Sequence, residues 1–125
     1  MRPRTIPFAV LASGFIACAC VRPSLDELPV NEYAGHYTFG ASSSWFWACG
    51  AAAADSSWAT FTDRAVAQRD SIQRTGALST GERHFVRWRA AVTSSGEVGP
   101  RGPGVPALLV REILVMRPPA AGDCR

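Results

Sequence analysis

The sequence predicts a mainly β fold that contains a single helix. Five short segments are rich in aromatic and branched residues, and several of them alternate between two faces, as strands do. Clusters of glycine, serine and proline separate most of these segments. One segment instead carries the start and stop signals of a helix. With 125 residues in all, the chain is expected to form one domain.

The predicted strands differ in how clearly they alternate. In chain order, we expect strands at 33–39, 44–49, 58–61, 83–93 and 107–117. In the second, Trp45 and Trp47 share one face and Phe46 takes the other. In the fourth, Trp88 lies opposite a face that carries two arginines. The last strand breaks its alternation, which predicts a bulge near Arg111.

A helix is predicted over residues 62–75. Thr62 is a suitable N-cap and Gly76 a suitable residue just beyond the C-terminus. One stripe of the helix is only weakly apolar; it consists of Ala65, Val66, Arg69, Ile72 and Gly76. We therefore expect the helix to lie on a barrel end and to bury little beyond Val66 and Ile72.

The order of these elements predicts the architecture. Three strands, a helix and two more strands follow one another, as in a five-stranded β-barrel of the oligonucleotide/oligosaccharide-binding (OB) type. An immunoglobulin-like sandwich would need about seven strands. Around the barrel, we expect a signal peptide at 1–17, a tether at 18–32, the barrel itself at 33–119 and a C-terminal tail at 120–125.

The N-terminal segment has the pattern of an export signal. Arg2 and Arg4 precede a short apolar run that ends at Phe15-Ile16-Ala17-Cys18. This ending resembles a bacterial lipobox, in which the cysteine is lipidated and becomes the first residue. Cys18 is therefore the expected site of a membrane anchor of palmitate-type acyl chains, and Cys20 offers a second register. The alternative is an ordinary signal peptidase site near Ala17 or Ala19.

Export would place the remaining cysteines in an oxidising compartment, where disulfides persist. Cys49 and Cys124 are then expected to form a disulfide, and two unpaired thiols are the alternative. A metal site made of cysteines is not expected, because no Cys-x-x-Cys pair occurs in the sequence.

Three short motifs resemble a known family. They are Gly35-x-Tyr37-x-x-Gly40, Ser44-x-Phe46-x-x-Cys49-Gly50 and Trp58. The pattern is similar to small bacterial envelope lipoproteins, and in particular to the C-terminal OB-type barrel of the NlpE-like copper-homeostasis and surface-sensing lipoproteins. The resemblance implies a non-catalytic role in envelope-stress signalling or protein interaction. The sequence departs from the pattern at Ala48, where proline is common, and it lacks a second barrel with Cys-x-x-Cys, which weakens a metal-sensing role.

One strand face is a candidate binding surface. Arg83, Arg87 and Arg89 alternate along it with Phe85 among them, so it could pair with and stack on an anionic ligand or partner. The alternative is a solvated strand face. Nucleic acid is not an expected partner, because the net charge falls from +3 to +1 once the signal peptide is removed.

Other candidate sites are weaker. His36 and His84 are the two histidines and could bind copper or zinc, but histidines on a sheet surface beside arginine are the preferred interpretation. No cofactor is expected, and no Gly-x-Ser-x-Gly elbow or placed carboxylate pair indicates an enzyme.

The sequence thus predicts a non-enzymatic, membrane-anchored lipoprotein of the bacterial cell envelope that faces the periplasm or the outside. It would serve as an interaction or stress-sensing module, with an envelope protein as its partner. The alternative is a small binding barrel for an anionic saccharide or a metal ion.

Overall fold

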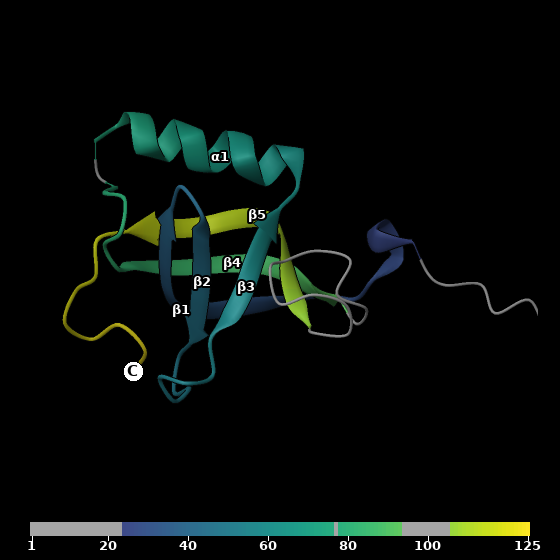
Figure 1. Cartoon of the computed structure of the whole chain (residues 1–125), viewed down its shortest axis with the longest axis horizontal. Coiled ribbons are helices and arrows are strands. Elements are labelled where there is room, and N and C mark those ends of the chain that lie inside the picture. The colour runs from purple at the N-terminus through teal and green to yellow at the C-terminus, as the bar shows by residue number, and fades with distance from the viewer. Residues whose placement is uncertain (1–23, 77, 94–105) are drawn as a thin grey trace, which may run out of the picture.

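The computed structural model describes residues 24–76, 78–93 and 106–125 (Figure 1). The predicted signal peptide, the candidate lipidation residues Cys18 and Cys20, and nearly all of the glycine- and proline-rich segment before the last strand lie outside the described residues.

The described residues form the predicted closed five-stranded, OB-like barrel with one helix between the third and fourth strands. After a short 3-10 turn η1 (Leu25–Glu27), the elements are β1 (Val30–Gly40), β2 (Ser43–Ala48), β3 (Ser57–Phe61), α1 (Asp63–Arg74), β4 (His84–Thr93) and β5 (Ala107–Arg117). Neighbouring strands follow the order β1-β2-β3-β5-β4, and β4 pairs back to β1. The pairing of β3 with β5 is parallel, and the other four pairings are antiparallel.

The barrel core is built around Trp88 of β4. Its side chain is fully buried, and the rings of Tyr37, Phe46 and Phe61 surround it with centroids 5.0 to 5.6 Å away. Phe46 faces inward, while Trp45 and Trp47 on either side of it face outward and are half-buried, as the alternation of β2 predicts. Offset and edge-to-face aromatic contacts of this kind add to the stability gained by burial alone.

Two strands differ in detail from the predicted pattern: β1 in where it starts and β5 in its irregularities. β1 begins at Val30, before the expected start at Tyr33, because the backbone of residues 30–32 pairs with residues 89–91 of β4. The predicted bulge at Arg111 is confirmed, and a second irregularity occurs at Leu114, where the register against β4 shifts again.

The helix α1 packs against β5 and β3 and lies close to the β1–β2 turn (Figure 1). Thr62 is its N-cap, as predicted, and accepts a hydrogen bond from the Ala65 backbone N–H. The fully buried helix residue is Ala65, which was not expected to be buried, whereas Val66 is half-buried. Ile72 packs against the core as expected.

The side chain of Gln68 accepts a hydrogen bond from the Ile113 N–H at 2.8 Å and fixes α1 to β5 beside the bulges.

Candidate functional site

The predicted arginine face lies on the outside of β4, but acidic neighbours match part of its charge. Arg87 and Arg89 are each about half exposed. Arg87 lies 3.3 Å from Glu32 of β1, and Arg89 lies 3.6 Å from Glu112 of β5. Exposed pairs of this kind contribute little to stability, but they lower the net positive potential that an anion would meet.

The other two residues of the predicted face form an aromatic and cationic row across the barrel wall. The pairing registers place Trp47, His36, Phe85 and Arg117 side by side on four successive strands. The Arg117 guanidinium lies 4.6 Å from the centre of the Phe85 ring, and Arg83 lies 5.0 Å from the centre of the Trp47 ring. A hollow of about 240 Å³ beside this row is lined by His36, Trp47, Arg83 and both disulfide cysteines, with neighbouring loop residues.

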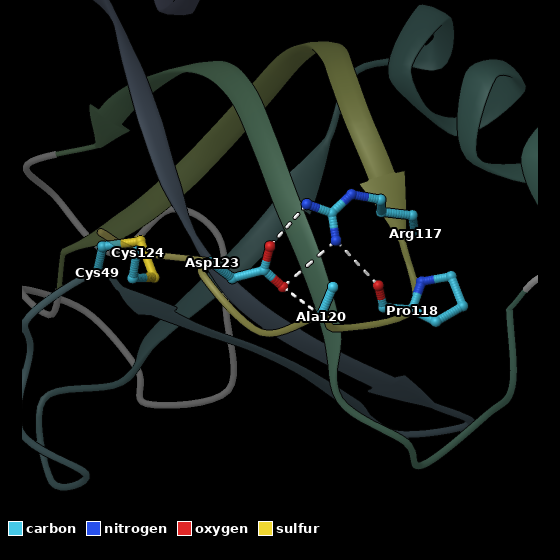
Figure 2. A network of polar contacts seen from close by, with 6 residues as sticks. All are labelled: Cys49, Arg117, Pro118, Ala120, Asp123 and Cys124. Carbon is cyan, nitrogen blue, oxygen red and sulfur yellow. Dashed lines mark hydrogen bonds and ion pairs between the residues drawn. A yellow bond between two sulfur atoms is a disulfide. The ribbon is translucent and has the colours of Figure 1, made fainter.

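The C-terminal segment, residues 118–125, follows Arg117, the last member of this row, and is attached to the barrel beside it (Figure 2). We call it the C-terminal strap. The predicted disulfide between Cys49 and Cys124 is formed, with the two Cα atoms 5.1 Å apart. Arg117 donates hydrogen bonds of 2.6 and 3.3 Å to the two carboxylate oxygens of Asp123, and the Ala120 N–H donates a third at 2.6 Å (Figure 2). The strap therefore has one covalent and one ionic attachment.

The Arg117–Asp123 pair governs the charge states at the strap. The hydrogen bonds from Arg117, followed by that from the Ala120 backbone, lower the pKa of the Asp123 carboxyl below its usual range. The same pair raises the pKa of Arg117. The Asp123 side chain is only 6% exposed, so its carboxylate depends on these donors more than on water.

The two histidines lie on opposite sides of the barrel wall. His84 is 2% exposed and faces the interior, where its ring packs 5.5 Å from that of Phe39. Its Nε2 atom accepts a hydrogen bond from the Ser79 N–H at 3.1 Å. The interpretation of His84 as a sheet-surface residue is therefore wrong. His36 lies on the outside with Phe85, so the two imidazoles do not meet at one metal site. Within 24–76, 78–93 and 106–125, no cluster of three or more His, Cys, Asp or Glu residues is arranged to hold a metal ion.

A larger hollow, which the sequence did not reveal, lies between the β1–β2 turn and α1. We call it the turn pocket; it has a volume of about 490 Å³. Arg69 and Gln73 of α1 line one side, Trp58 of β3 lines another, and the turn contributes Ser42 and Ser43. Tyr37, Phe39 and Ser44 also border it. Pockets of this size, with aromatic walls and a few converging polar groups, are typical ligand sites.

Tyr37 and Ser44 connect the turn pocket to the barrel. Their hydroxyls are 2.8 Å apart, and the Ser44 hydroxyl donates to the Ala59 carbonyl at 2.6 Å, so one polar chain joins β1, β2 and β3. Burial raises the pKa of the Tyr37 phenol, although the hydrogen bond with Ser44 and the positive charge of Arg69 oppose the shift. Tyr37 therefore stays protonated at neutral pH and acts as a hydrogen-bonding group.

One sequence signal did point toward the turn pocket. Arg69 lies on the stripe of α1 that faces the barrel, where a charged side chain is unusual. The serines at 42–44 indicated only a turn, because nothing in the sequence shows that they lie opposite a helix.

No protein-family model matches the chain, and comparisons with curated proteins and with solved structures gave no significant match. Among the described residues, no helix is both long and apolar enough to cross a membrane.

Proposed function

We propose that the protein is a non-enzymatic, lipid-anchored module of the bacterial cell envelope that acts by binding. The observation that carries this proposal is the Cys49–Cys124 disulfide, which joins the residue that follows β2 to the C-terminal strap. Bonds of this kind persist in exported proteins and are rare in the bacterial cytosol. The disulfide thus agrees with the export signal and with lipidation at Cys18.

The outer surface supports a binding role with a protein partner. Exposed Arg83 lies over Trp47 next to His36, and the strap borders this group. Cationic and aromatic side chains are the groups that dominate protein interfaces energetically. An envelope protein with an acidic surface is the partner that this chemistry would recognise.

Of the alternative ligands, an anionic saccharide gains support and a metal ion does not. His36 and His84 face opposite sides of the barrel wall, which is poor support for a shared ion. The turn pocket, with its arginine and aromatic walls, favours an anionic organic ligand.

Mass spectrometry of the protein extracted from membranes tests the proposal. We expect a mass that corresponds to residues 18–125 plus acyl chains, with Cys49 and Cys124 open to thiol labelling only after reduction. The variant Cys18→Ser should lose the acyl mass and the membrane association, whereas Cys20→Ser should keep both. A soluble, unacylated wild-type protein, or free thiols at 49 and 124 without reductant, would contradict the proposal.

A further inference from the structure

We propose that the turn pocket binds an acidic saccharide, a sugar whose ring carries a carboxylate. This inference rests on the binding role proposed above but does not depend on the lipid anchor. It also places the ligand away from the arginine face that the sequence suggested, on the side of the barrel where α1 meets the β1–β2 turn.

The charge of the pocket comes from a largely buried arginine. The Arg69 side chain is 25% exposed, and its guanidinium lies 4.8 Å from the centre of the Phe61 ring. Its ion pair is with the adjacent Asp70, at 3.7 Å and on a half-exposed carboxylate. By contrast, Arg117 holds Asp123 through two hydrogen bonds, of 2.6 and 3.3 Å. Arg69 also hydrogen-bonds with the Tyr37 hydroxyl, so its guanidinium meets a phenol, an aromatic ring and one loosely paired carboxylate. A carboxylate bound in the pocket would pair with this partly desolvated cation more favourably than Asp70 does.

The pocket lining carries no opposing charge. Among the lining residues that the structure describes, Arg69 is charged, and the others are aromatic, hydroxyl-bearing, amide-bearing or small. A ligand with one negative group would thus be favoured over a cation, and a neutral ligand would add no charge partner for the guanidinium.

The remaining side chains suit a sugar ring. Trp58 offers an aromatic surface, and the Trp45 ring makes an edge-to-face contact with it at 5.2 Å. Ser42, Ser43 and the Gln73 amide provide donors and acceptors around it. A sugar presents carbon-bound hydrogens on its ring faces and hydroxyls at its edge, so it can satisfy both kinds of wall at once.

The pocket walls are held in place before any ligand arrives. The Gly81 N–H donates to the Phe39 carbonyl at 2.8 Å, and buried His84 accepts from the Ser79 N–H, so both bonds fix the loop that carries Thr80 at the pocket edge. At Gly40 a Cβ atom would lie 2.9 Å from Ser43 Oγ and 3.6 Å from Thr80 Cγ2, so glycine keeps this wall open. Preorganised walls lower the entropic cost of binding.

Calorimetry and NMR titration of the full-length chain test the proposal, with the protein in detergent and its disulfide oxidised. The probes are digalacturonate as an acidic disaccharide, cellobiose as a neutral one, and glutarate as a carboxylate without a sugar ring. We expect digalacturonate to bind at least about tenfold more tightly than either other probe, because cellobiose lacks the carboxylate and glutarate lacks the sugar ring. Amide resonances of Ser42, Ser43 and Gln73 should shift.

Matched variants locate the site. Arg69→Gln should weaken digalacturonate binding by roughly tenfold or more, and Arg64→Gln, the same change at an exposed position of α1, should not. Gln73→Ala tests the pocket separately should Arg69→Gln fail to fold, and it should weaken binding severalfold. Equal affinity for cellobiose or glutarate, no binding of any probe at 10 mM, or binding lost in Arg87→Ala but kept in Arg69→Gln would each overturn the proposal. None of these results bears on the lipid anchor.

Discussion

At Gly35 the backbones of β1 and β2 approach each other closely. A Cβ atom at this position would come within 2.9 Å of the Ala48 Cα atom and 2.8 Å of the Phe46 ring. Tyr37, two residues later, is fully buried and hydrogen-bonds with Ser44. Three of the motif residues that resemble envelope lipoproteins, Gly35, Tyr37 and Ser44, therefore have a role in building the barrel. The motif accordingly supports the fold more directly than it supports a function.

Replacing Gly35 with alanine should lower the free energy of unfolding by about 1–3 kcal/mol, because the added methyl group meets backbone that cannot move without breaking strand pairing. Urea unfolding measures the change. Gly40→Ala is the matched control, since the nearest atom there is the flexible Ser43 hydroxyl. Equal unfolding midpoints for the two variants would show that β2 shifts freely at this point.

The burial of single residues was predictable where alternation is strict. Val86 and Trp88 are inward-facing and His84 shares their parity, so the same period of two that placed the tryptophan also places the histidine inside. Treating His84 as a surface residue overlooked this pattern. By contrast, the choice of Ala65 over Val66 for burial on α1 depends on the rotation of the helix, which a weakly apolar stripe does not fix.

Among the elements, β5 shows what sequence can and cannot reveal. The bulge at Arg111 interrupts a visible alternation and turns its side chain toward η1, where it bonds with the Leu25 carbonyl and lies 3.7 Å from Asp26. The irregularity at Leu114 lies within an apolar run and leaves no such signal. It was unpredictable because it follows from the pairing with β4 and from barrel curvature.

The C-terminal strap should loosen at low pH. The pKa of Asp123 is lower in the folded protein than in the unfolded chain, so its contribution to stability is complete above the ordinary aspartate pKa of about 3.9 and is lost as pH falls through the folded value. The gap in unfolding free energy between wild type and Asp123→Asn should therefore be constant above about pH 5 and shrink below about pH 4.

Chemical unfolding at pH values from 7 to 2 measures this gap. Asp55→Asn is the control, because Asp55 lies exposed in the β2–β3 loop. A gap that keeps its size down to pH 2 would mean that the Arg117–Asp123 pair does not stabilise the fold.

For the whole molecule, closure depends on contacts between distant parts of the chain. The parallel pairing of β3 with β5 completes the barrel, and the disulfide joins residues 75 positions apart. Element order was enough to predict this architecture, because few arrangements accommodate it. The turn pocket was not predictable, because its walls come from β1, β2, β3 and α1, and only the folded chain brings them together.

Removing the disulfide with Cys49→Ser/Cys124→Ser should lower the free energy of unfolding by roughly 4 kcal/mol, because the closed loop restricts the unfolded chain. Denaturant unfolding with and without reductant measures this loss. Reductant should shift the wild type to the stability of the double variant and leave the variant itself unchanged. An equal effect of reductant on both proteins would assign the loss to another cause.

Barrel closure also has a consequence for molecules crowded together. Within the described residues, each of the five strands has a partner on both sides, so a strand from another copy could add only at short unpaired stretches, as between β2 and β3. Self-association at high local density would then have to proceed mainly through side chains and not through backbone hydrogen bonds. Barrel closure therefore limits the backbone pairing by which fibrous assemblies grow.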